Sequence, residues 1–122
     1  MLIWLLNKQS IKLIFPLAKK WYEKFKSGEK KIEYREVKPY WIKRLAKICG
    51  QENIDSLLRG KTTELIFHGP LPACILRLGY TAHNLSASIT KIEIVNGKST
   101  DLHIDKPVFA IHLADIKQQT EV

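Results

Sequence analysis

The chain has 122 residues, of which 45% are hydrophobic and 26% charged, and its formal net charge is +8. This length fits one domain with a core that needs no disulfide or metal, and the composition excludes an intrinsically disordered protein. Residues 19–47 contain eleven Lys or Arg against four Glu, so most of the excess positive charge lies there. Such a basic segment favours a polyanionic partner such as nucleic acid, or it forms a solvated lysine-rich surface.

The start of the chain and the cysteines indicate where the protein resides. The apolar run 2–6 is too short for a membrane span or a signal-peptide core, and we expect it to form a short strand or a loosely attached end. Cys49 and Cys74 lack the spacing of a disulfide framework and are interpreted as reduced thiols. We therefore expect a cytoplasmic protein that does not enter a membrane.

Predicted strands and helices alternate in the first half of the chain. Leu17, Trp21 and Phe25 recur with helical spacing, and Gly28 provides the left-handed cap that ends this helix. Pro16 is expected in the first turn of the helix, where proline is tolerated. The expected elements are a strand over 11–15, a helix over 17–27, a strand over 31–38, a helix over 40–47 and one or two helical turns between 50 and 60.

Short strands dominate the second half of the chain. Asn96-Gly97 is a strong turn signal, and residues 81–86 are expected to form a polar loop. Strands are expected over 63–68, 73–80, 88–95 and 108–113, with a brief pairing segment at 102–104. Helices early and strands late predict an α+β domain with a largely antiparallel sheet that can close into a barrel. The whole chain, 1–122, is expected to be one domain, with a core over about 11–114 and a polar tail over 115–122.

Three charged residues, Lys30, Glu33 and Arg35, stand out because they follow directly on the predicted helix end. Side chains alternate along a strand, so Glu33 and Arg35 should share one face, and Lys30 can reach the same face from the preceding turn. The cluster then either lines a polar pocket that binds a phosphate or a carbonyl, or forms a structural ion pair across one strand.

Other kinds of site are not indicated. The four histidines and two cysteines show no zinc-ligand spacing, and there is neither a glycine-rich phosphate loop nor a nucleophile elbow. We therefore expect no metal and no cofactor. Among the aromatic residues, Trp21 and Tyr22 are interpreted as core, whereas Tyr40 and Trp41 are candidates for an exposed platform on which bases stack.

The run Gly28-x-Lys30-x-x-Glu33-x-Arg35 resembles the G-x-K-x-x-E-x-R signature of ASCH domains, which are relatives of the PUA fold. The Pro39-Tyr40-Trp41 run and Arg77-x-Gly79-Tyr80 are also similar to the family, and the resemblance covers about residues 11–113. It implies a small β-barrel of about five to seven strands with two or three flanking helices. It also implies a cleft that binds RNA or a nucleotide. The implied ligand-binding residues are Gly28, Lys30, Glu33, Arg35, Tyr40, Trp41, Arg77 and Tyr80.

Two alternatives to simple binding remain open. One branch of the family is an amidohydrolase that removes the acetyl group from N4-acetylcytidine with a lysine base, a threonine nucleophile and a later glutamate acid. Lys30 matches the lysine, Glu33 stands at the nucleophile position, and a helical segment for the acid is not apparent. An enzyme acting on a modified nucleoside or on RNA would then use Lys30 as base and Glu33 as acid or orienting group. The other alternative is a structural or protein-interaction domain.

Overall fold

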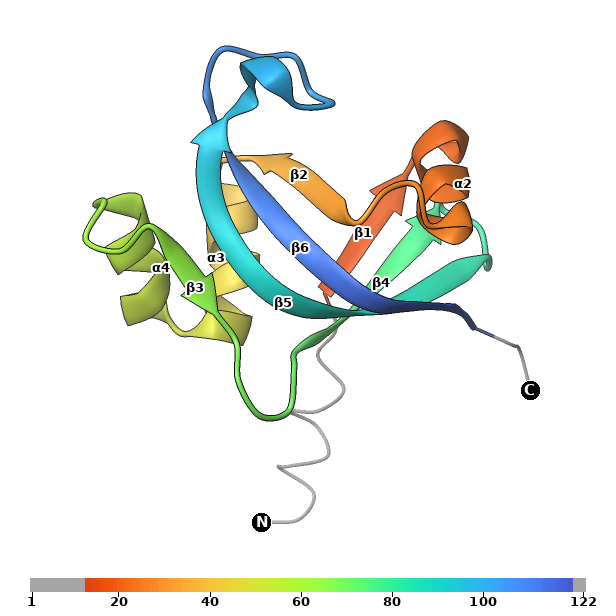
Figure 1. Cartoon of the computed structure of the whole chain (residues 1–122), viewed down its shortest axis with the longest axis horizontal. Coiled ribbons are helices and arrows are strands. Elements are labelled where there is room, and N and C mark those ends of the chain that lie inside the picture. The colour runs from red at the N-terminus through yellow and green to blue at the C-terminus, as the bar shows by residue number, and fades with distance from the viewer. Residues whose placement is uncertain (1–12, 120–122) are drawn as a thin grey trace.

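The computed structural model describes residues 13–119, and the apolar run 2–6 lies outside the described residues. Within this range the fold is α+β, with six strands and three α-helices (Figure 1). The elements are β1 (Leu13–Leu17), α2 (Lys19–Ser27), β2 (Ile32–Glu36), α3 (Pro39–Cys49), α4 (Gln51–Leu58), β3 (Glu64–Ile66), β4 (Ala73–Leu78), β5 (Asn84–Asn96) and β6 (Pro107–Gln118). None of the described helices is long and apolar enough to cross a membrane.

The six strands form one curled, mixed sheet. Its order is β1-β4-β5-β6-β2, and β3 pairs with β5 beside this path. The pairing of β1 with β4 is parallel and every other pairing is antiparallel. The long strands β5 and β6 bend the sheet into a half-barrel, with α2 on one side and α3 and α4 on the other (Figure 1). The predicted α+β class and largely antiparallel sheet are therefore confirmed, and β1 and β2 form the two ends of the strand order.

One hydrophobic cluster fills the half-barrel and extends under all three helices. Alternate residues of β1 point into it, as the burial of Leu13, Phe15 and Leu17 shows. Each helix adds apolar side chains from one stripe, which gives it a fixed place against the sheet. The helical contributions to the core are Tyr22, Phe25, Leu45, Ile54 and Leu57.

Two expected boundaries of the first half are wrong. Pro16 does not begin a helix but lies inside β1, and α2 starts only at Lys19. The strand β1 pairs with β4 alone among the described strands, and proline is tolerated in such an edge strand because no second neighbour needs its missing N–H.

Two strands of the second half, β5 and β6, are longer than expected, whereas β3 and β4 are shorter than the expected 63–68 and 73–80. Residues 84–86, assigned to a loop, begin β5, and β6 continues to Gln118 through much of the expected polar tail. The two extensions support each other, because Leu85 pairs with Gln118 and Ser86 with Lys117. The hydrophobic pattern does not predict this pairing, because several side chains at both strand ends are polar.

The connection from β5 to β6 is a folded loop over 97–106 instead of a tight hairpin, and the brief strand expected at 102–104 does not form. A Cβ on Gly97 would lie 2.7 Å from Val108 Cγ1 and 2.8 Å from the Ile104 carbonyl oxygen, so only glycine fits without a shift. The buried Thr100 hydroxyl donates to the Gly97 carbonyl at 2.8 Å. These contacts hold the loop close to the barrel, next to the end of β2.

Candidate functional site

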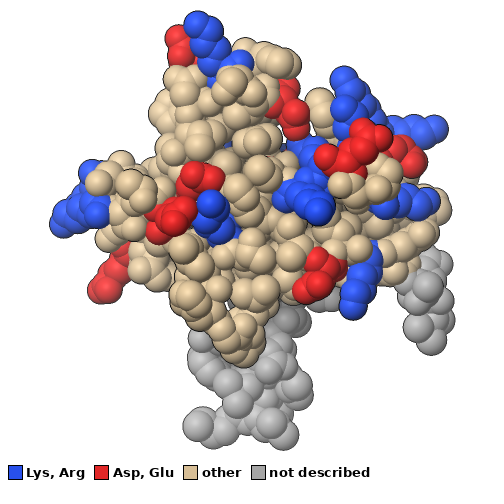
Figure 2. All heavy atoms as spheres, in the orientation of Figure 1, with Lys and Arg blue, Asp and Glu red and all other residues tan. Residues whose placement is uncertain are grey.

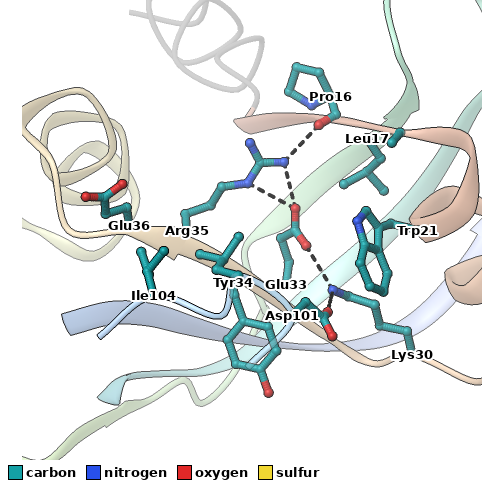
Figure 3. Close-up of a pocket in the computed structure, with 12 residues that line it drawn as sticks. Pro16, Leu17, Trp21, Lys30, Glu33, Tyr34, Arg35, Glu36, Asp101 and Ile104 are labelled. Carbon is teal, nitrogen blue, oxygen red and sulfur yellow. Dashed lines mark hydrogen bonds and ion pairs between the residues drawn. The ribbon is translucent and has the colours of Figure 1, made fainter. Parts of the chain in front are cut away.

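A pocket of about 330 Å³ lies where the two end strands β1 and β2 approach each other (Figure 3). We call it the seam pocket. Its walls come from the end of β1, the start of α2, strand β2 and the 97–106 loop. The lining residues are Pro16, Leu17, Ala18, Trp21, Lys30, Glu33, Tyr34, Arg35, Glu36, Asp101, Leu102 and Ile104.

Glu33 is the centre of the seam pocket and is only 4% exposed. Its Oε2 accepts hydrogen bonds from Arg35 Nε at 3.0 Å and Nη2 at 2.6 Å, while its Oε1 lies 3.4 Å from Lys30 Nζ. A carboxylate this buried is stable only when opposite charges and hydrogen bonds replace its water. The three residues singled out in the sequence therefore converge, as their alternation along β2 predicts.

Arg35 also connects the two ends of the sheet. Its Nη2 donates to the Pro16 carbonyl oxygen of β1 at 2.8 Å (Figure 3). The guanidinium carbon lies 5.3 Å from the ring centroid of Phe15 and 4.8 Å from that of Trp41. Cation–π contacts at these distances stabilise the charged group where water is partly excluded. Trp41, a candidate for an exposed platform, thus supports Arg35.

Lys30 is held by charges and by aromatic rings. Its ammonium makes ion pairs with Glu33 and with Asp101 of the 97–106 loop. The same ammonium lies 4.7 Å from the ring centroid of Trp21 and 5.4 Å from that of Tyr34. Asp101 therefore fastens the loop over the pocket, and Trp21 and Tyr34 provide flat apolar walls.

The charges within the seam pocket are balanced. Lys30 and Arg35 face the carboxylates of Glu33 and Asp101, and Glu36 at the rim lies 3.2 Å from Lys38 Nζ. The pocket therefore offers no unpaired cation for a phosphate group. It offers carboxylate oxygens that accept hydrogen bonds, beside aromatic and aliphatic surfaces.

Tyr34 lines the pocket, and its hydroxyl points away from the Glu33 carboxylate (Figure 3). Burial, followed by the charges of Asp101 and Glu93, raises the pKa of the Tyr34 phenol. The phenol therefore keeps its proton at neutral and mildly alkaline pH, and a neutral phenol can donate to a ligand carbonyl.

Positive charge gathers outside the pocket, on α2. Lys20 Nζ and Lys24 Nζ lie 4.7 Å and 5.4 Å from the ring centroid of Trp21, and Lys19 and Lys26 lie on the same helix. None of these four lysines forms an ion pair with any described residue. Figure 2 shows basic side chains gathered on the side of the molecule where α2 lies. The helix therefore gives the pocket a basic border.

Five of the predicted ligand-binding residues lie outside the seam pocket, and Trp41, which packs against Arg35, is one of them. Gly28 has φ +88° and forms the turn after α2, as its cap role requires, but it borders a different hollow. Tyr40 is 56% exposed and stacks edge-on against Trp41, while Tyr80 is 90% exposed in the turn after β4. Arg77 lines another hollow, together with Asn84.

Sequence reasoning missed other pocket residues. Trp21, assigned to the core, is only partly buried and forms a pocket wall, because the apolar stripe of α2 is wide enough for one residue to reach the edge. Asp101 and Ile104 come from a loop that carries no motif, and nothing in the sequence places that loop beside β2. Across residues 13–119 no three His, Cys, Asp or Glu side chains are grouped as a metal site requires.

The buried Cys74 behind Glu33 makes stability depend on alkaline pH. Burial, with the Glu33 charge second, raises the pKa of the Cys74 thiol from 9.0 to about 12. The folded thiol keeps its proton while the unfolded one loses it, so Cys74 lowers the free energy of unfolding by about 1.4 kcal/mol per pH unit above pH 9. Denaturant unfolding at several alkaline pH values, with Cys74→Ala for comparison, measures this. Burial also raises the pKa of Cys49 to about 12, which adds a similar fall in both proteins. Equal pH slopes for the two proteins would contradict the assignment.

Comparisons with protein-family models, with curated proteins and with solved structures found no match to this chain.

Proposed function

We propose that the seam pocket binds RNA or a nucleotide by enclosing a base. The observation that carries the proposal is the fixed Glu33 carboxylate beside the Trp21 ring, in a pocket of about 330 Å³ that Tyr34 also lines (Figure 3). A base needs a flat surface for its ring and hydrogen-bond partners for its edge, and both are present.

The balanced charge supports a base over a phosphate as the group inside the pocket. Lys30 and Arg35 are already paired with carboxylates, so a phosphate would have to displace Glu33 or Asp101. An uncharged ring that carries N–H groups does not have to displace a carboxylate, because the carboxylate oxygens accept hydrogen bonds from those groups. Bases with an exocyclic amino group fit this description.

The lysines of α2 support binding of a longer strand. Lys20 and Lys24 flank Trp21 at the mouth of the pocket, where the phosphates next to an inserted base would lie. Phosphate contacts supply sequence-independent affinity, and base contacts supply selectivity. The ASCH-like signature is part of the same proposal, because its Lys30, Glu33 and Arg35 are the residues that shape the pocket.

The salt dependence of single-stranded RNA binding tests the role of α2. The double substitution of Lys20 and Lys24 by glutamine is expected to weaken binding at low salt. It should also reduce the slope of log K against log salt by about 1.4, or about 0.7 for each lost phosphate contact. Substituting the exposed Lys43 and Lys47 of α3 removes the same charge elsewhere and serves as control. An equal loss of RNA affinity in both double variants would mean that binding depends only on the net charge of the protein.

A hydrolase acting on a modified nucleoside is the second candidate function for the seam pocket. It is favoured by the presence of Lys30 and Glu33 in one pocket, but both are engaged in ion pairs that would have to open for proton transfer. Incubation with N4-acetylcytidine and chromatography of the products separates turnover from binding. Binding of N4-acetylcytidine without any product would exclude the hydrolase and support the binding function.

A further inference from the structure

A second hollow, of about 680 Å³, lies on the face of β4 and β5 opposite to the buried Leu76 and Leu85. It forms where β4 ends, β5 begins and β6 ends, three segments that lie side by side near the C-terminal end in Figure 1. We call it the strand-end hollow. All its lining residues except Ala82 are polar, and they include Arg77, Asn84, Ser86 and Lys117.

Pairing across three strands places the two cations of this hollow at its edges. Arg77 of β4 is the register partner of Asn84, and Lys117 of β6 is the partner of Ser86. Asn84 and Ser86 share one face of β5, since the residue between them, Leu85, is buried in the core. The pairs Arg77–Asn84 and Ser86–Lys117 are therefore neighbours, joined by the shared face of β5.

The charge of the strand-end hollow is not balanced. None of its lining residues is acidic, and neither Arg77 nor Lys117 forms an ion pair with any residue in the described range 13–119. Arg77 donates from Nε to Asn84 Oδ1 at 3.3 Å, which orients the guanidinium and leaves its terminal nitrogens available. Lys30 and Arg35 of the seam pocket, by contrast, are both paired with carboxylates.

We propose that the strand-end hollow is a phosphate-binding site, with Arg77 and Lys117 as its cationic residues and Asn84 and Ser86 as neutral donors. A guanidinium presents two parallel N–H groups that match two phosphate oxygens, and a lysine adds a point charge. The shared chemistry is a phosphate oxyanion, which is supplied either by a nucleic-acid backbone or by a small phosphorylated molecule. The site uses none of the seam-pocket residues, so it stands independently of the function proposed there.

Nuclear magnetic resonance titration of the full chain with inorganic phosphate, in a phosphate-free low-salt buffer, tests this site. We expect saturable shifts at the amides of residues 81–86 and 117–119 and at Arg77 Nε. The Arg77→Gln and Lys117→Gln variants should each weaken this binding about tenfold, as the loss of a charge-assisted contact predicts. Lys43→Gln, which removes an exposed lysine of α3, should leave it unchanged. Lys117 is exposed, so its substitution should leave the fold intact even if Arg77→Gln does not.

The outcomes separate the site from general attraction to a basic protein. The proposal is overturned if phosphate produces no saturable shifts at this hollow, or if Lys117→Gln and Lys43→Gln weaken binding equally. A second titration with single-stranded RNA identifies the source of the phosphate. Competition between RNA and inorganic phosphate at these resonances assigns the site to a backbone, and binding of phosphate without competition assigns it to a small molecule. If the seam pocket does not bind RNA, the expected phosphate titration at the strand-end hollow stays the same, so the two proposals are tested separately.

Discussion

Replacing Glu33 by glutamine is expected to lower the free energy of unfolding by about 3 to 5 kcal/mol, because it leaves two partly desolvated cations without their shared partner. Arg35 and Lys30 both contact this carboxylate, which is itself only 4% exposed. Glutamine keeps the size of the side chain, so the loss measures charge and hydrogen bonding instead of packing. Denaturant-induced unfolding of the two proteins at neutral pH provides the comparison.

A matched variant on the same strand controls for the change in net charge. Glu36→Gln also removes one carboxylate from β2, but Glu36 pairs with the exposed Lys38 and Lys106. Such a surface pair contributes about 0 to 1 kcal/mol to stability, so the free energy of unfolding of this variant should be close to that of the wild type. Similar losses from the two substitutions would mean that Glu33 is not the buried centre of an ion-pair network.

Replacing Trp21 by leucine is expected to weaken binding of single-stranded RNA by about tenfold to a hundredfold, which corresponds to about 1 to 3 kcal/mol of lost base stacking. Leucine preserves the apolar contact of α2 with the core and removes the flat ring next to Lys30. Fluorescence anisotropy with a labelled oligonucleotide gives the affinities of both proteins.

Tyr40→Leu serves as the control for this second prediction. Tyr40 is an exposed aromatic residue close to basic side chains, including Arg44 whose guanidinium carbon lies 4.2 Å from its ring centroid, but it does not line the seam pocket. Its substitution should leave RNA affinity unchanged. A loss from Tyr40→Leu together with wild-type affinity of Trp21→Leu would move the base-binding surface to α3, where the sequence first suggested it.

The structural role of Arg35 decides which variants are informative. The side chain joins β2 to the Pro16 carbonyl of β1 and packs against the stacked rings of Phe15 and Trp41. Its removal would open the seam as well as change the pocket, so reduced RNA binding by Arg35→Ala alone would not distinguish recognition from folding. Trp21 is the better choice because it forms no ion pair itself and contacts the network only through the cation–π contact of its ring with Lys30.

Local periodicity explains why the charged cluster could be predicted. Glu33 and Arg35 are two residues apart on a strand, so their common face follows from strand geometry alone. Lys30 precedes that strand in the turn after α2, within reach of the same face. The glycine that ends the helix has the left-handed conformation expected of it.

The remaining pocket residues depend on contacts between distant parts of the chain. Asp101 meets Lys30 because the 97–106 loop folds back on Gly97, and neither the loop conformation nor its direction follows from a local pattern. The sequence predicts Pro16 in a helix because proline favours a first helical turn, yet the edge of the sheet accommodates it equally well. Arg77 and Tyr80 were grouped with the signature by resemblance, whereas strand pairing places Arg77 with Asn84.

The most direct test of the account is a nuclear magnetic resonance titration with a short single-stranded RNA, observing the Trp21 indole and the amides of Tyr34 and Asp101. The seam pocket as a base-binding site predicts saturable shifts at all three and magnetisation transfer between Trp21 and base protons. Binding that shifts only the lysine-bearing surface of α2, with these three resonances unchanged, would contradict it.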